Sequence, residues 1–514
     1  TSTLIPDNIV SKDSKVDKPS PKAPVSKNSE PTTPISELKE KGRIATSLET
    51  ARKYLGQKFT DTLFNFKELT KGLEGYKDFI NQDSVWQSKA SGRAELLKLK
   101  IVDIVKEAKA KGISLEELSD YLMAKHARDR NKHIVENVDE NNPFGSGLDE
   151  VTISEILDVD ESKRKQLDEL ADKVYEVVES TRSRMLESGL ISQEAYDALK
   201  EVESYVPLTN FEDESIEVSS IMQGNDISIK GKEWKQAKGR TTKAGNILVN
   251  MLQQGTAVEI RAAKNELLKT IHDIIVKHPD SDIAKVYTPE TLPKQKILVT
   301  ANNPKYVGVK VDGEQKYIRF ENDLLAQNIQ NTTNAQAGDL LKNLSKVNNY
   351  LRAMITTWNP EFMLGNFFRD LATGIIHLQG QQDLNVDLDG KKITKEAIAL
   401  VPKAIKQIAK FEIGKKGQDT KLGKMYQEYI KDGAKTGWTQ QTKYEDLVKD
   451  LKKASNLEGE KSVSKRIGTV KNFVEGLNTS VENGIRFAAY VSARNNGVSR
   501  EAAASLSKEL TVNF

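Results

Sequence analysis

The chain of 514 residues contains no cysteine. This excludes disulfide bonds, zinc sites built on thiolates and cysteine nucleophiles. Long apolar runs are lacking too, because no stretch reaches the 18 or more apolar residues typical of a spanning helix. No charged segment followed by an apolar one opens the chain as a signal peptide would. The sequence therefore predicts neither a disulfide scaffold nor a transmembrane helix.

An excess of charge of one sign is also lacking, since 77 Lys and Arg against 74 Asp and Glu leave a net charge of +3. Proteins that wrap nucleic acid normally show a marked basic excess or stripe, so there is no strong nucleic-acid signal. No Gly-x-Ser-x-Gly elbow or dinucleotide fingerprint occurs, and the five histidines lack metal-ligand partners at helical spacing. We therefore predict no catalytic residues, no metal site and no cofactor.

The apolar residues that are present recur mostly at alternating steps of three and four, the spacing that buries one face of a helix. Hydrophobic residues make up 37% of the chain, which is enough for a sizeable core. Residues 296–320 differ, because short β-branched segments alternate there and Asp312-Gly313 forms a hairpin turn. We predict a mainly α fold: a multi-helix, bundle-like body with one small antiparallel β insertion at about 296–320.

The chain divides by composition into a tail and three helical regions. Residues 1–38 hold six prolines among Ser, Lys and Asp, which predicts a disordered tail or linker. The helical regions are predicted at 39–245, 246–378 and 379–514. The chain begins at Thr1 without a methionine and stops inside a patterned block, so we expect a fragment or processed piece, truncated at its C-terminal end.

A polar motif lies on a helix with a clear start. Ser114 and Glu117 form a capping box, and the helix continues through YLMAKHARDRN at 121–131. Its candidate site residues are Lys125, His126, Arg128, Arg130 and Asn131. One interpretation is a polar site at the end of the helix. The other is that the histidine closes the edge of the core while the arginines are solvated, which is the usual role of such residues.

A second motif lies in 339–378, where the spacing predicts two helices joined at a corner. Asn359 can cap the second helix, with Pro360 in its first turn. The candidate residues there are Trp358, Asn359, Pro360, Asn366, Arg369 and Asp370, of which we predict the last three to be structural. A third block near the C-terminus pairs Glu482 with Arg486 at i,i+4, and Ser499 is expected to cap the last helix.

These blocks resemble one family. LRAMITTWNPEFMLGNFFRDLATG is similar to the T-x-W-N-P-x-F…N-x-x-R-D segment of the large polyvalent proteins of bacteriophages, often named for a PLxRFG motif. The 121–131 motif resembles their YLxAxHAxxRN block, and the C-terminal block resembles a segment ending in Asn-Phe. Residues 205–211 occupy the place of the PLxRFG signature, but Asn210 replaces its arginine and Glu212 its glycine. We expect a proline-anchored extended turn there.

The resemblance implies a function that the composition does not. It points to a non-catalytic helical segment of a protein carried in the virion and delivered to the host envelope or cytoplasm with the DNA, as an ejection, conduit or early host-takeover scaffold. Its partners are expected to be other phage virion or ejection proteins. The alternative is an enzymatic, nucleic-acid-processing or antirestriction module. Motif residues in helix-packing seams favour the scaffold, and motif residues gathered at one concave surface favour the alternative.

Two further stretches carry charge in patterns that suggest ligands. Residues 385–396 nearly fit a calcium loop, with candidate ligands Asn385, Asp387, Asp389 and Glu396, although a turn at Asp389-Gly390 explains the same residues without metal. Residues 391–416 combine eight lysines with large apolar residues. They predict peripheral membrane contact or, alternatively, an ordinary solvated lysine face. Pro402 favours two short helices in this stretch over one long one.

Overall fold

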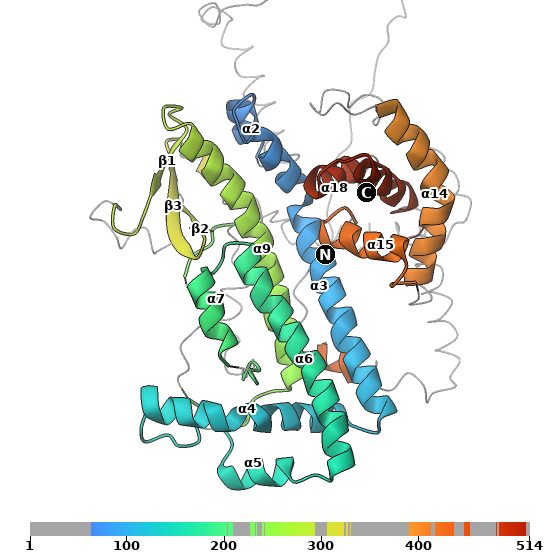
Figure 1. Ribbon diagram of the computed structural model, residues 1–514. Helices are drawn as coiled ribbons and strands as arrows, with labels where there is room; N and C mark the ends of the chain where they lie inside the picture. Colours follow the sequence, from blue (N-terminus) through green and yellow to red (C-terminus); the bar gives the residue numbers. More distant parts are fainter. Residues whose placement is uncertain are drawn as a thin grey trace, which may run out of the picture. The chain divides into compact units, whose positions relative to one another are not determined.

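The computed structural model (Figure 1) describes most of the chain from residue 63 onward. The described residues are 63–202, 204–208, 227–231, 233, 239–240, 242–292, 306–322, 325–326, 329, 390–412, 417–435, 447–452, 480 and 483–509. They all belong to one compact unit, Phe59–Phe514. The predicted tail at 1–38 and the predicted corner at 339–378 lie outside them, and the region boundaries near 245 and 378 stay predictions.

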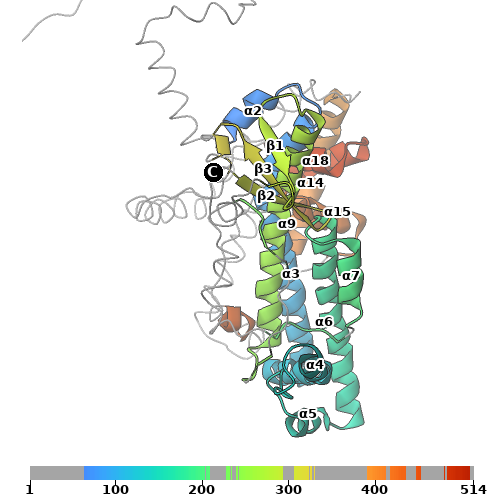
Figure 2. The ribbon, with the colours of Figure 1, turned by 90° about the vertical axis from the view of Figure 1, so that its left-hand side faces the viewer.

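Two long helices organise the described residues: α3 (Tyr76–Ala110) and α9 (Ile247–Lys277). They lie side by side in both ribbon views (Figures 1 and 2). The start of α3 and the end of α9 share one core, whereas the end of α3 and the start of α9 share another, so the two helices run antiparallel. The three-and-four spacing predicted α9, and Asn246 caps it by accepting from the Leu248 and Val249 amides.

Four helices from the first 200 residues pack on this pair or on one another. They are α4 (Leu115–Asn137), α5 (Glu150–Leu157), α6 (Glu161–Glu187) and α7 (Gln193–Lys200). The predicted cap of α4 is confirmed, since the Ser114 hydroxyl accepts from the Glu117 amide at 3.0 Å. Helix α6 packs on both α3 and α9, while α4 runs across their lower end in Figure 1 and carries α5 beneath it.

A three-stranded antiparallel sheet covers the far end of α9. Its order is β1 (Ala284–Tyr287), β3 (Glu314–Phe320), β2 (Tyr306–Val311). The predicted hairpin is confirmed, because Asp312 and Gly313 both have positive φ, 50° and 83°, as a tight two-residue turn requires. The sheet also includes a strand upstream of the predicted range: β1 has a single buried side chain and shows too little alternation to be recognised from the sequence. Residues 296–300 lie outside the described residues.

The C-terminal elements form a third core against α3. They are α14 (Gly390–Glu412), α15 (Lys421–Lys431), a helical segment at 483–495 and α18 (Arg500–Glu509), which Ser499 caps as predicted. The short helix α2 (Phe64–Thr70) packs on α3 near the sheet. The predicted class is confirmed: the fold is mainly α with one small antiparallel sheet.

Helix α14 corrects one prediction, because it continues through Pro402 as a single helix. An interior proline removes one backbone hydrogen bond and costs about 3 kcal/mol. Val401 and Ala404, on either side of it, are buried in the same core, whereas the proline itself faces solvent. Packing of the apolar face therefore holds the helix together across the proline.

Candidate functional site

Most polar residues of the α4 motif join α4 to its neighbours. The Lys125 ammonium lies 2.7 Å from the Asp168 carboxylate of α6, which also accepts from the Tyr121 hydroxyl at 2.8 Å. Arg128 is exposed and pairs with Glu150 of α5 at 2.6 Å. These contacts tie α4 to α5 and α6, so both residues serve helix packing.

Asn131 holds the loop that links α4 to α5. Its amide donates to the Leu148 carbonyl at 3.0 Å, and its side-chain oxygen accepts from the Ser146 amide at 2.7 Å. The loop carries the turn sequence Asn-Pro-Phe-Gly-Ser-Gly, whose last glycine has a positive φ of 85°. Asn131 thus fixes a loop that has no helix or strand of its own.

His126 is the member of the motif that such contacts do not explain. Its side chain is buried at 4% exposure and packs edge-on against the Tyr205 ring, with centroids 5.4 Å apart. Its Nδ1 has no hydrogen-bond partner among the described residues. Burial, and then the positive charges of Arg130 and Arg182, lowers the pKa of His126 to about 4. The imidazole is therefore neutral at pH 7.

Tyr205 is surrounded by cations from three segments. The Arg182 guanidinium of α6 lies over its ring at 5.1 Å, the geometry of a cation–π contact. Arg130 of α4 and Arg240 also lie close enough for their charges to act at the site. The expectation that the arginines of the α4 motif are solvated holds for Arg128 but not for Arg130, because the Nε of Arg130 is buried without a partner in the described structure.

The positive charge of Arg182 is poorly matched by carboxylates. One N–H of Arg182 donates to the Val202 carbonyl at 3.4 Å, and Glu179 lies 4.0 Å from another. Arg240 donates to the Leu208 carbonyl at 3.0 Å. Burial lowers the pKa of the Arg182 guanidinium, and Tyr205 and Glu179 only partly oppose this effect. Backbone carbonyls and an aromatic ring therefore do much of the work that carboxylates usually do around buried arginines.

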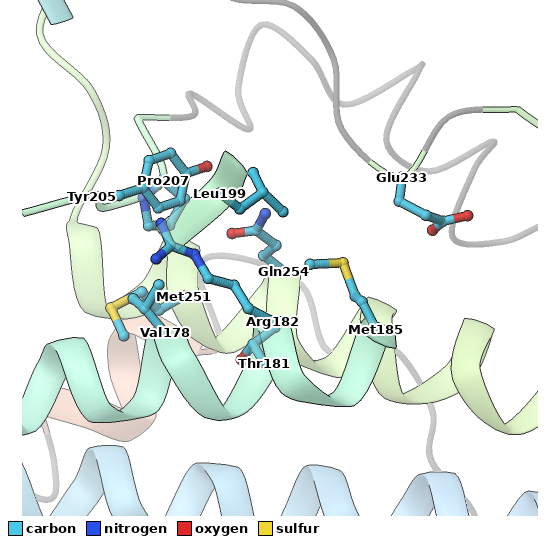
Figure 3. Close-up of a pocket in the computed structure, with 10 residues that line it drawn as sticks. All are labelled: Val178, Thr181, Arg182, Met185, Leu199, Tyr205, Pro207, Glu233, Met251 and Gln254. Atoms are coloured by element: carbon cyan, nitrogen blue, oxygen red, sulfur yellow. The ribbon is translucent and has the colours of Figure 1, made fainter. Parts of the chain in front are cut away.

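A cavity of about 50 Å³ lies beside Arg182 and Tyr205 (Figure 3). One water needs roughly 10–15 Å³, so the cavity has room for several waters or one small ion. Its walls are mostly apolar, with a few polar groups, the composition common to ligand sites. The lining residues are Val178, Thr181, Arg182, Met185, Leu199, Tyr205, Pro207, Glu233, Met251 and Gln254.

Glu233 is the carboxylate of this wall, and it is already neutralised. Its side chain is 2% exposed and pairs with Arg261 at 2.6 Å and with Lys310 at 3.0 Å. Figure 3 places Glu233 across the cavity from Tyr205 and Arg182. One end of the cavity therefore carries the cation Arg182, and the other end carries Glu233, a carboxylate that already has two cationic partners.

Many of the predicted site residues lie outside the described residues. These are Trp358, Asn359, Pro360, Asn366, Arg369, Asp370, Glu482, Asn385, Asp387 and Asp389. Arg486, the described half of the predicted Glu482 pair, is fully buried in the helical segment at 483–495. Glu396, the last candidate calcium ligand, accepts from the Asn496 amide at 2.7 Å. Its carboxylate is thus used to join α14 to that segment.

The lysine-rich stretch is amphipathic as predicted, but its apolar face is occupied. Ile393, Val401, Ile408 and Phe411 are buried in the C-terminal core, and Ile398 is an apolar residue of α14 that remains exposed. Within the described residues no helix is long and apolar enough to cross a membrane, and no cluster of three metal-ligating side chains occurs. No protein-family model, curated protein or solved structure matches the chain.

Of the five residues that characterise the cavity and the Tyr205 cluster, the sequence singled out three and missed two. His126, Arg130 and Tyr205 lie in the two motifs that the sequence singled out. Arg182 and Glu233 lie in an ordinary amphipathic helix and in an irregular polar segment. A usable signal was present, since Arg182 falls on the same face of α6 as the apolar residues Val178 and Met185, where a charge requires a reason.

Proposed function

We propose that this chain is a non-catalytic helical segment of a large polyvalent bacteriophage protein that is packaged in the virion and delivered to the host with the DNA. The proposal rests on the resemblance of the motif blocks together with one structural observation. That observation is the use of the motif residues as joints: Lys125 and Arg128 pair with neighbouring helices, and Asn131 holds a loop. Such contacts suit a scaffold that must keep its shape.

The protein content of purified virions tests the packaging part of this proposal. Quantitative mass spectrometry should detect peptides of this chain in filled particles, and fewer copies in particles that have released their DNA in vitro. The major capsid protein serves as the control, because its copy number stays the same on ejection. A chain made in infected cells but missing from filled particles would contradict the proposal.

The enzymatic or nucleic-acid-processing alternative makes a different prediction for the motif residues. If the motifs are structural, Arg369→Ala lowers the thermal stability of the protein, and any loss of infectivity follows from that instability. A variant that keeps its melting temperature and loses infectivity would favour the alternative. Asn366→Ala and Asp370→Ala extend the same comparison to the other polar residues of that motif.

We also propose that residues 391–416 make peripheral contact with a membrane surface. Because the large apolar residues of α14 are buried, contact would fall to the lysine face, which is sensitive to salt. Co-sedimentation with anionic and neutral liposomes at low and high salt tests it. Binding to anionic liposomes at low salt alone supports the electrostatic contact, and equal, negligible binding to both lipids would leave a solvated helix face.

A further inference from the structure

We propose that the cavity between α6, α9 and residues 205–207 binds a phosphate group, either free or as the end of a larger molecule, with Arg182 as its principal cation. This inference is independent of the packaging proposal. It rests on the placement of buried charge around the cavity and on the distance of Arg182 from the nearest carboxylate among the described residues.

The first argument is the imbalance of charge at the Tyr205 end. Buried ions in proteins are normally paired or hydrogen-bonded, because an unpaired one is costly. Arg182 is 7% exposed, lines the cavity, and has Glu179 no nearer than 4.0 Å. Behind it, Arg130 adds a second guanidinium with a buried, unpartnered Nε. An incoming anion would give Arg182, which lines the cavity, a closer ionic partner than Glu179.

The second argument is that the opposite wall does not repel an anion. Glu233 is held between Arg261 and Lys310, so this group of three side chains has one net positive charge. Adding Arg182 and Glu179, which lies 4.0 Å from it, gives three cations against two carboxylates around the cavity. An anion is therefore favoured over a cation.

The third argument concerns shape and hydrogen bonding. A guanidinium presents a planar fork of N–H donors that matches the oxygens of a phosphate group. Thr181 and Gln254 add neutral polar groups to the wall, and Val178, Leu199 and Met251 add apolar ones. The small size of the cavity restricts the enclosed part of the ligand to a group of a few atoms, with anything larger attached outside.

His126 reports on an occupant without being part of the cavity wall. It touches Tyr205, and the charges of Arg130 and Arg182 lower its pKa. An anion beside these arginines offsets their charge and raises the pKa of His126. A proton resonance of the buried imidazole ring of His126, followed by NMR at a pH near 5, should therefore shift as the site fills.

The test is calorimetric titration of the whole chain with inorganic phosphate, adenosine monophosphate and acetate. We expect saturable binding of inorganic phosphate or of adenosine monophosphate, with acetate at least tenfold weaker. Binding of inorganic phosphate indicates a free ion, and binding of adenosine monophosphate alone indicates a phosphate ester. No saturable binding of either phosphate probe, or acetate bound as tightly as phosphate, would overturn the proposal.

Matched variants locate the site. Arg182→Gln should weaken binding at least tenfold and abolish the shift of the His126 resonance. Arg128→Gln makes the same chemical change at an exposed position away from the cavity, and should leave affinity unchanged. Circular dichroism and melting confirm that each variant is folded, and Arg182→Lys, which keeps the charge and removes the planar fork of donors, replaces Arg182→Gln if the latter is not. Equal weakening by Arg128→Gln, or none by the folded cavity variant, would show surface ion binding and overturn the assignment.

Discussion

Two arginines only two residues apart on α6 have opposite surroundings. Arg184 is 3% exposed by side chain and pairs with Glu259 at 2.9 Å and with Glu266, which lies 2.7 Å from Lys89. Arg182 faces the other way, toward a tyrosine ring and a carbonyl. Burial lowers the pKa of both guanidiniums, but the two carboxylates outweigh it at Arg184 and raise its pKa.

The difference separates a structural ion network from charge that is available to a ligand. The Arg184 network balances two cations against two carboxylates and joins α3, α6 and α9. Burial raises the pKa of Glu266, yet Arg184 and Lys89 outweigh it and lower that pKa to about 2. The Arg182 cluster has no comparable balance among the described residues. Equal burial therefore does not imply an equal role, and the partners of a charge decide it.

The largest expected effect comes from breaking the balanced network. Arg184→Gln leaves Glu259 and Glu266 buried beside Lys89 alone, and loss of one member of a buried ion pair costs about 3–5 kcal/mol. The free energy of unfolding, measured in urea, should fall by this amount. Arg182→Gln removes a charge without a close carboxylate partner and should cost less, about 2 kcal/mol, the range of one cation–π contact that is shielded from water. Similar losses in both variants would remove the distinction between the two arginines.

The second effect is a dependence of stability on pH that belongs to the unbalanced cluster. The pKa of His126 is about 4 in the folded protein and about 6.5 when unfolded, so between these values the unfolded chain binds the proton. The free energy of unfolding should therefore fall as the pH drops from 6.5 to 4, by up to about 3 kcal/mol. Arg130 and Arg182 face the imidazole and cause part of this shift, after burial.

His126→Gln isolates that contribution from the other groups that titrate in the same range. Urea unfolding at several pH values between 7 and 4 should give a shallower dependence in His126→Gln than in the original protein. The exposed His133 offers a matched control, since His133→Gln should keep the original dependence. Parallel curves for the original protein and His126→Gln would show that His126 already binds its proton in the folded state.

Local signals in the sequence were enough for much of the fold. Ser114 and Glu117 predicted the start of α4, and Asp312-Gly313 predicted the hairpin, because a cap or a tight turn depends on residues within four positions of one another. Strand β1 escaped because it is four residues long and pairs with β3 over thirty residues later. The strand forms by pairing with the hairpin, and the pattern of its own four residues does not predict it.

The two arginine sites depend on contacts that no local pattern carries. Arg184 meets Glu266 across 82 positions of sequence, and His126 of α4 meets Tyr205 through a contact between their rings. The motifs located His126 and Tyr205 separately and did not indicate that they touch. A helical wheel of α6 places charge on its buried side, but only the neighbouring helices decide which of the two arginines finds carboxylates.

A third effect, smaller than the first two, contrasts Asn131 with His126 inside the same motif. Asn131 makes both of its hydrogen bonds to the α4–α5 loop, so Asn131→Ala leaves the Ser146 amide without this acceptor and the Leu148 carbonyl with only the Ser146 hydroxyl at 3.4 Å. Such a loss costs about 1–2 kcal/mol for groups partly shielded from water. Urea unfolding measures it, and hydrogen exchange at Ser146 should accelerate. An unchanged exchange rate would mean that the loop is held by its own turns.

The smallest effect on stability is expected at Arg128. It compares an exposed ion pair with the two buried clusters around Arg184 and Arg182. Its guanidinium and the Glu150 carboxylate are 52% and 64% exposed, so water and salt screen their attraction. Arg128→Gln should therefore leave the urea midpoint within experimental error at physiological salt, with a small decrease resolved only at low ionic strength. A clear loss of stability that persists in high salt would show that Arg128 contributes through packing of its aliphatic stem on α5, which water does not screen.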